Sequence, residues 1–149
     1  MKNKFFICMM MVLLSCVSSY AGTGVKVNER VINSFRKDFA TAQSVVWEKS
    51  NEYVKATFTL NQQVMFAWYD RQGSLMAVSR NIVSTQLPIR LLTEVKKHYA
   101  QYWITDLFEI AMNNETIYYI TLENGDHKLV LRSTGAAGWE LYRKTRERD

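Results

Sequence analysis

The two histidines of the chain, His98 and His127, are the first candidates for a chemical site. Glu94 and His98 lie one helical turn apart, and both residue types can bind a metal ion. His98 falls at the edge of an apolar helical stripe, where a solvated histidine is the simpler explanation. His127 follows Asp126, and with Ser133 these residue types match a catalytic triad. No nucleophile-elbow sequence or glycine-built oxyanion hole accompanies them, so we expect no catalysis there.

Other residue types exclude further chemistries. The glycines are scattered at turn positions and form no phosphate-cradling loop of the P-loop or dinucleotide type. Both cysteines, Cys8 and Cys16, lie in the N-terminal segment, so the rest of the chain has no thiol nucleophile and no cysteine ligand for zinc. The sequence therefore predicts a protein that is not an enzyme and uses no cofactor and no metal.

The first 21 residues have the pattern of a signal peptide. Lys2 and Lys4 precede an unbroken apolar run over residues 5–14, and Ser19-Tyr20-Ala21 offers small residues for cleavage after Ala21. The run is about half the ~20 residues that cross a bilayer, so no transmembrane span is expected. These features predict a periplasmic or secreted protein.

A second interpretation of the same segment is a lipoprotein signal. Leu13-Leu14-Ser15-Cys16 resembles a bacterial lipobox, which would end the signal before Cys16 and place a lipid anchor on that residue. The leucine before Ser15 is a less usual choice in a lipobox. Soluble export is favoured, with a membrane-anchored lipoprotein as the alternative.

The charge of the exported part is small. Lys2 and Lys4 account for two of the 19 basic residues, so 17 remain against 14 acidic residues, a formal charge of +3. Much of the excess lies in a basic C-terminal tail that a solvated terminus explains. Export also argues against nucleic acid, and none is expected as a partner.

The exported part contains an internal duplication. An apolar stripe at helical spacing recurs sixty positions later. Its members are Val31, Ile32, Phe35 and Phe39 in the first copy, and Leu91, Leu92, Val95 and Tyr99 in the second. We expect helices over 29–39, capped by Asn28, and over 88–100, with Pro88 at the first helical position.

Four strands are predicted after each helix, from β-branched and aromatic residues in alternation. They cover 45–47, 53–60, 64–69 and 75–78 in the first copy, and 107–110, 117–123, 128–132 and 139–142 in the second. Trp47 is matched with Phe108, and Asn124-Gly125 is expected to form a type I′ turn.

This pattern predicts an α+β fold, a tandem duplication of a helix plus a four-stranded meander. One antiparallel sheet would have both helices packed on one face and its other face open. We expect a single domain over 22–149, with repeat one at about 28–80 and repeat two at about 87–144.

The aromatic and turn residues also resemble a known family. The matching pattern is Phe35-x3-Phe39-x2-Ala42-x2-Val45-x-Trp47, Tyr53-x4-Phe58, Trp68-Tyr69-Asp70-x2-Gly73 and Leu87-Pro88. It resembles the PepSY-like family of exported bacterial proteins, which is similar in its duplicated fold to the beta-lactamase inhibitor protein. Ala40 departs from the family, which usually has proline there, and the last hairpin is longer. The resemblance implies a binding or inhibitory module of the envelope, without catalytic residues.

The open face of the sheet is the predicted working surface. Strand alternation turns tyrosine, threonine, lysine and arginine side chains outward, types that are common in protein interfaces. The predicted partner-binding residues are Tyr53, Lys55, Thr57, Met65, Tyr69, Tyr119, Thr121 and Arg132. Tyrosine and threonine are also simply good strand formers, and a register shift of one residue would exchange the two faces.

The sequence therefore favours an exported envelope binding module. It would act as an inhibitor or modulator of an exported protein or peptide through the open face of its sheet. The alternative is a small-ligand or envelope-polymer binding protein that uses the same aromatic side chains.

Overall fold

A computed structural model describes residues 25–146 of the 149-residue chain. The predicted signal peptide, with Cys8, Cys16 and both proposed processing sites, lies outside the described residues, as does Arg148 of the basic tail. None of the helices in the described part is long and apolar enough to cross a membrane.

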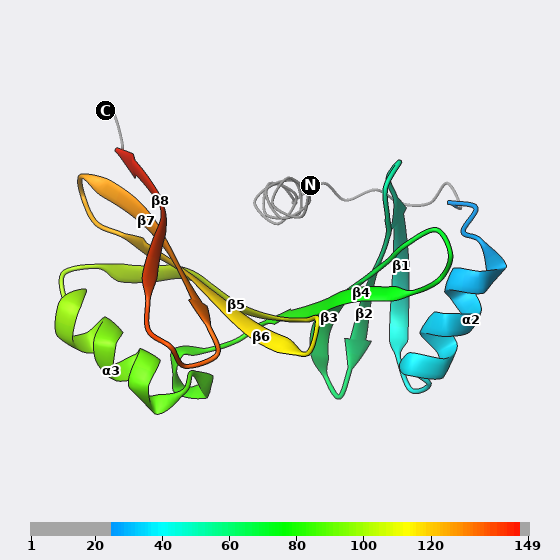
Figure 1. Ribbon diagram of the computed structural model, residues 1–149, viewed down its shortest axis with the longest axis horizontal. Helices are drawn as coiled ribbons and strands as arrows, with labels where there is room; N and C mark the ends of the chain where they lie inside the picture. Colours follow the sequence, from blue (N-terminus) through cyan, green and yellow to red (C-terminus); the bar gives the residue numbers. More distant parts are fainter. Residues whose placement is uncertain (1–24, 147–149) are drawn as a thin grey trace.

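In residues 25–146, two α-helices and eight strands follow one another in the order of the predicted duplication (Figure 1). The first copy contains α2 (Glu29–Asp38), β1 (Gln43–Lys49), β2 (Val54–Leu60), β3 (Gln63–Tyr69) and β4 (Leu75–Asn81). A short 3₁₀ helix, η1 (Ser84–Gln86), leads to the second copy. That copy contains α3 (Ile89–His98), β5 (Trp103–Met112), β6 (Glu115–Glu123), β7 (His127–Thr134) and β8 (Glu140–Arg146).

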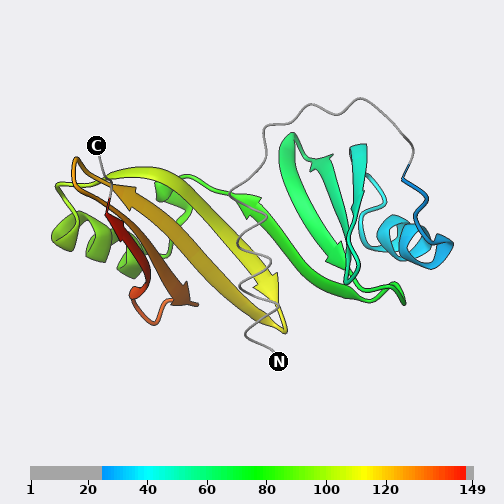
Figure 2. The same ribbon diagram turned by 90° about the horizontal axis from the view of Figure 1, so that it is seen from above.

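The eight strands form one antiparallel sheet in sequence order, from β1 at one edge to β8 at the other. The sheet bends into a trough, and both helices lie outside the bend (Figures 1 and 2). Side chains of α2 and α3 pack in two separate clusters under the two halves of the sheet. The predicted α+β fold, with both helices on one face, is therefore confirmed, and the opposite face is concave.

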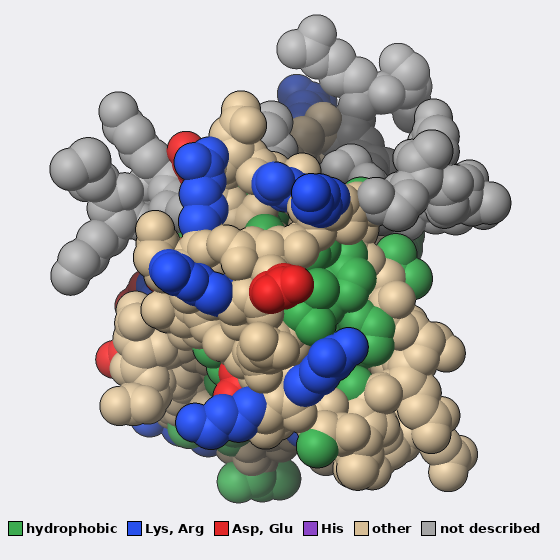
Figure 3. All heavy atoms as spheres, turned by 90° about the vertical axis from the view of Figure 1, so that its right-hand side faces the viewer, with side chains coloured by type: hydrophobic (Ala, Val, Ile, Leu, Met, Phe, Trp, Pro, Cys, Tyr) green, Lys and Arg blue, Asp and Glu red, His purple; other side chains and the backbone are tan. Residues whose placement is uncertain are grey.

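Local signals explain the helix boundaries. The Asn28 side chain accepts a hydrogen bond from the Arg30 N–H at 3.0 Å, which caps α2 as predicted. In α3, Pro88 is the N-cap residue itself, with extended backbone, and the helix starts one residue later than expected. The outer side of α2 exposes Arg30, Arg36 and Lys37, and Figure 3 shows basic side chains around a smaller apolar area on this side.

The two copies are equivalent at single-residue level. Residues 31–40 and 91–100 have the same burial pattern, position by position. Trp47 pairs with Ala56 in the first copy, and Leu107 pairs with Ile120 in the second. Trp47 therefore corresponds to Leu107, and the expected match with Phe108 is wrong. Phe108 lies on the opposite face, because neighbouring strand residues point to opposite sides.

The hairpin turns differ from the prediction. Neither Asn124 nor Gly125 has positive φ, so the expected type I′ turn is wrong. Instead, the Asn124 Oδ1 accepts hydrogen bonds from the Asp126 and His127 backbone N–H groups, at 3.0 and 2.9 Å. Positive φ occurs at the two-residue turns 61–62 and 113–114, which connect β2 to β3 and β5 to β6. Asparagine adopts this conformation more readily than most residues.

Candidate binding face on the concave side of the sheet

An apolar cluster lies on the concave face of the sheet and contains residues of both copies. It consists of Tyr53, Trp68, Ala77, Phe108, Ile110, Ile117, Tyr119 and Val130, with Phe66, Met76 and Met112 packed against them. We call these residues the concave cluster. It contains no residue of α2 or α3, because both helices pack on the other side of the sheet. Within residues 25–146, no helix forms a second layer over it.

Trp68 lies at the centre of the first copy's part of this cluster. Its side chain is 0% exposed in the 149-residue chain, and its Nε1–H has no hydrogen-bond acceptor among residues 25–146. A buried donor without an acceptor costs about 1–3 kcal/mol.

Each copy has a cation paired with an aromatic ring at equivalent positions of two neighbouring strands. The cation is on the earlier strand in the first copy and on the later strand in the second. Lys55 pairs with Trp68 across β2 and β3, and Tyr119 pairs with Arg132 across β6 and β7. The Lys55 Nζ lies 3.2 Å from the Glu48 carboxylate, so the buried charge has a counter-ion. The concave face thus holds two cation–aromatic pairs, one in each half of the trough.

The same cation also faces an aromatic ring of the cluster. The Lys55 Nζ lies 5.2 Å from the centroid of the Phe66 ring, a cation–π distance. In the second copy, the Phe108 and Tyr119 rings stack at 5.2 Å with an interplanar angle of 20°. Burial raises the pKa of Tyr119 to about 12, against the opposing effect of Arg132. Tyr119 therefore presents a neutral ring at neutral pH.

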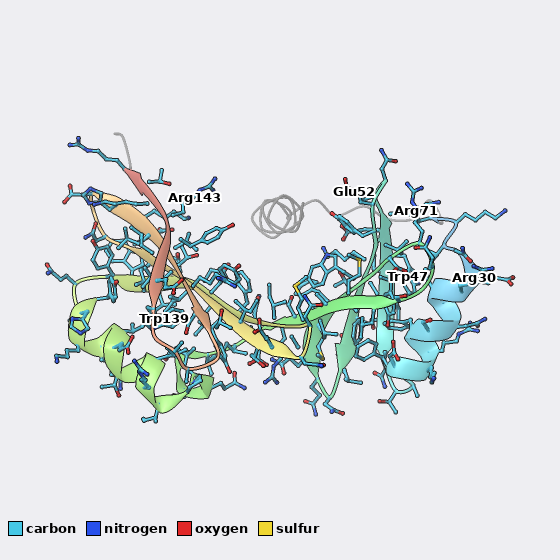
Figure 4. All side chains as sticks on the ribbon, viewed as in Figure 1. Arg30, Trp47, Glu52, Arg71, Trp139 and Arg143 are labelled. Carbon is cyan, nitrogen blue, oxygen red and sulfur yellow. The ribbon has the colours of Figure 1, made fainter. Side chains whose placement is uncertain are left out.

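Charged side chains lie on both sides of this apolar centre. Figure 4 shows Glu52 and Arg143 at opposite rims of the trough, and both are exposed. Arg143 pairs with Val130 of the cluster across β7 and β8. An apolar centre with a polar rim is the usual composition of a protein interface.

Six of the eight predicted partner-binding residues lie on the concave face. Tyr53, Tyr119 and Arg132 are in the cluster or paired across it. Lys55 and Thr57 pair with Trp68 and Phe66, and Thr121 pairs with Val130. Their placement agrees with the expected strand alternation in β2, β6 and β7.

Met65 and Tyr69 lie on the other face, under α2, so their expected placement on the open face is wrong. The Tyr69 hydroxyl donates a hydrogen bond to the Asp38 carboxylate at 3.0 Å. Burial, and then Asp38, raise the pKa of Tyr69 well above its usual range. The expected register of β3 was shifted by one residue, which exchanges the two faces of that strand.

Because of the same shift, the sequence did not predict Phe66 and Trp68 as part of the binding surface. They are the aromatic residues of β3 that face the concave side. The turn at 61–62 pairs Leu60 with Gln63, which places Ala56 opposite Ala67. The strands expected from the sequence, 53–60 and 64–69, left a loop of three residues between them. A loop of two residues at 61–62 would have given the correct register.

Two residues of the histidine candidates, Glu94 and Ser133, make contacts with other parts of the fold. Glu94 accepts hydrogen bonds from the Trp139 backbone N–H at 3.2 Å and from Arg90 at 3.1 Å. These contacts lower the pKa of Glu94, mainly through Trp139, and they attach the loop before β8 to α3. The Ser133 hydroxyl donates to the Gly135 carbonyl oxygen. Within residues 25–146, no three acidic, histidine or cysteine side chains gather as metal ligands would.

Comparison with known proteins identifies the fold. No protein family profile matches this chain, and no curated protein matches it. The solved structures include a BLIP-like protein from Bacteroides fragilis, with a TM-score of 0.71 and 18% identity over 85% of this chain and 92% of that one. A protein of the DUF2874 family from Bacteroides ovatus has a TM-score of 0.72 and 19% identity over 83% and 89%.

A third similar structure comes from Bacteroides eggerthii and is named provisionally as periplasmic. Its TM-score is 0.72, with 13% identity over 82% of this chain and 90% of that one. At these identities the likeness concerns the fold, which is that of the BLIP-like protein. The predicted resemblance to this duplicated fold is confirmed.

Proposed function

We propose that this protein is an exported binding module that holds an envelope protein or peptide in its trough. The observation that carries the proposal is the concave cluster, which combines aromatic, methionine and cationic side chains and has no helical layer over it in residues 25–146. The eight central members of the cluster are at most 8% exposed in the 149-residue chain, and Phe66, Met76 and Met112 are partly exposed beside them.

Export would bring this face to the envelope. Cleavage after Ala21 would leave residues 22–149, and both described α-helices of that part pack on the convex face. The similar structure that is named provisionally as periplasmic supports this location. The sequence pattern supports membership of the PepSY-like family, and processing at Cys16 would instead hold the same domain at a membrane.

The shape of the face favours a different protein over a second copy of this chain. Two concave surfaces leave a void when they face each other, whereas a convex loop or helix can fill a trough. Tyrosine, tryptophan and arginine dominate interface hot spots, and this face carries Trp68 in the first copy and the Tyr119–Arg132 pair in the second. A protein partner, rather than catalysis, is the use that these side chains support.

The test is affinity capture from the native envelope fraction with the tagged mature domain, residues 22–149. Thr57→Arg places a long charged side chain opposite Phe66 on the concave face. Thr93→Arg makes the same chemical change on the exposed side of α3 and is the matched control. Thermal unfolding of both variants checks that the fold is intact.

We expect a captured protein that is lost with Thr57→Arg and kept with Thr93→Arg. Equal capture by both variants would refute the concave face as the binding surface. If no protein is captured, a thermal-shift screen tests the alternative of a small ligand or envelope polymer, because a ligand of the folded state raises the melting temperature.

A further inference from the structure

The sheet has its fewest paired positions where the two copies meet. Strands β4 and β5 pair at four positions, from Val78 with Ala111 to Asn81 with Phe108. Strand β4 begins three residues earlier, at Leu75. Leu75 and Ala77 therefore pair with β3 on one side, and within residues 25–146 no strand pairs with residues 75–77 on the other.

A β-bulge accounts for this separation. Trp68 pairs with Ala77 and Tyr69 with Leu75, so Met76 is an extra residue in β4. A bulge bends its strand and increases the local twist. Figure 2 shows β4 turning away from the tip of the β5–β6 hairpin. The result is an unpaired strand edge inside the sheet rather than at its border.

A cleft occupies the space between the diverging strands. It has a volume of about 430 Å³ and is lined by residues 75–78 of β4 and 111–116 of the β5–β6 hairpin. A second hollow of about 290 Å³ lies next to it on the helix side. Val78, Ala111 and Thr116 line both. The larger cleft falls within the range of roughly 300–1,000 Å³ that is typical of ligand pockets.

The helix-side hollow already has its polar groups paired. The Arg80 Nε lies 2.5 Å from the Glu109 carboxylate, and its Nη1 donates to the Gln63 side-chain oxygen at 2.9 Å. These three side chains thus have partners without a ligand. On the β4 edge at residues 75–77, where β5 does not pair, backbone N–H and C=O groups are the groups that an extended polypeptide can bind as an added strand.

The cleft is continuous with the proposed binding face. Met76, Ala77 and Met112 line the cleft and also belong to the concave cluster. Leu75, at the mouth, is 42% exposed. We infer that the partner held in the trough inserts an extended apolar segment into this cleft, as an added strand on the edge of β4. This inference rests on the proposed function, and it specifies a partner with an exposed edge strand or extended loop.

The probe for this inference is a short peptide, so it needs no knowledge of the natural partner. The capped tetrapeptide acetyl-Val-Thr-Val-Thr-amide is titrated into the ¹⁵N-labelled mature domain and followed by NMR. We expect amide shift changes at residues 75–77 and 111–115. A version of the peptide with N-methylated backbone amides keeps the side chains but removes the donors, and should bind at least roughly tenfold more weakly.

Two variants separate the cleft from the rest of the trough. Ala111→Trp fills the floor of both hollows from an exposed position and should abolish the shift changes. Ala100→Trp makes the same change at an exposed position after α3 and should leave them unaltered. Thr57→Arg, which tests the concave face, should also leave the peptide titration unaltered.

Three results would overturn the inference: no shifts at residues 75–77 with millimolar peptide, equal binding of the N-methylated peptide, or full binding by Ala111→Trp. Each of them leaves the test of the concave face intact, because that test uses the natural partner and a different variant.

Discussion

At the scale of single residues, Tyr69 has a structural role rather than the binding role expected from the sequence. Its hydroxyl joins β3 to the end of α2 through Asp38, at 3.0 Å. Tyr69→Phe removes this hydrogen bond and keeps the ring. Because Asp38 is exposed to water, we expect a loss of about 1 kcal/mol of unfolding free energy in urea. Partner capture should be unchanged, and a loss of capture would return Tyr69 to the binding surface.

The same tyrosine gives a prediction for alkaline pH. Burial and Asp38 raise the pKa of Tyr69 in the folded protein, whereas in the unfolded chain it is about 10. Its contribution to stability is therefore complete below pH 10 and decreases as the pH rises further, by up to about 1.4 kcal/mol per pH unit. In Tyr69→Phe this contribution is absent. Urea unfolding between pH 9 and 11 should show a shallower decline in the variant, and parallel curves would contradict the assignment.

Side-chain orientation was predictable from sequence in three strands and not in β3. In β2, β6 and β7 the alternation of apolar and polar residues is clear enough to assign the faces. In β3, residues 64–69 are apolar or aromatic at every position. Alternation therefore does not show which of them point to the concave face and which to the helices. Only the length of the preceding turn sets the register there, and Asn61-Gln62 is a weak turn signal compared with Asn-Gly.

At the scale of elements, each copy attaches its last hairpin to its own helix through a glycine. Gly73 has φ +92°, and a Cβ on it would lie 3.0 Å from the Arg30 carbonyl oxygen of α2. Gly138 has φ +125° and lies beside Glu94 and Arg90 of α3. The equivalent glycine in each copy has positive φ, and at Gly73 the close approach of α2 also opposes a Cβ.

Gly73→Ala tests this attachment. Both the backbone conformation and the contact with α2 oppose a side chain there, so we expect a loss of roughly 1–3 kcal/mol of unfolding free energy. Gly125→Ala is the matched control, since its Cβ would meet nothing within 4 Å and its φ is not positive. Chemical denaturation of both variants provides the comparison. Equal stability of the two would mean that the Asp70–Gly73 turn can move away from α2 without cost.

The order and type of the elements followed from the duplication, but their ends did not. Strand β5 is ten residues long, whereas a short apolar run of four was expected. Its first residues, Trp103 and Ile104, are exposed and belong to the ladder with β6. Hydrophobic patterns predict the buried part of a strand, while exposed extensions depend on backbone pairing with a neighbour.

At the scale of the whole molecule, the concave cluster is the part of the core that both copies share. Each helix has its own cluster, and the two copies are joined in the sheet by four residue pairs. Trp68 and Phe66 of the first copy and Phe108 of the second occupy one face of the trough. Both helices of residues 25–146 pack on the other face of the sheet, so this shared part of the core has no helical layer from the described residues.

That arrangement predicts a native protein with a strong affinity for apolar dyes. The mature domain should bind the fluorescent dye ANS while its near-ultraviolet circular dichroism shows fixed tertiary packing, which excludes a molten globule. Phe66→Glu places a charge on the concave face and should reduce ANS fluorescence by roughly half or more, because it interrupts the apolar patch. Thr93→Glu, on the exposed side of α3, should leave it unchanged. A mature domain that binds no ANS in its native state would mean that residues 22–149 cover their own concave face, and the proposed binding surface would then be closed.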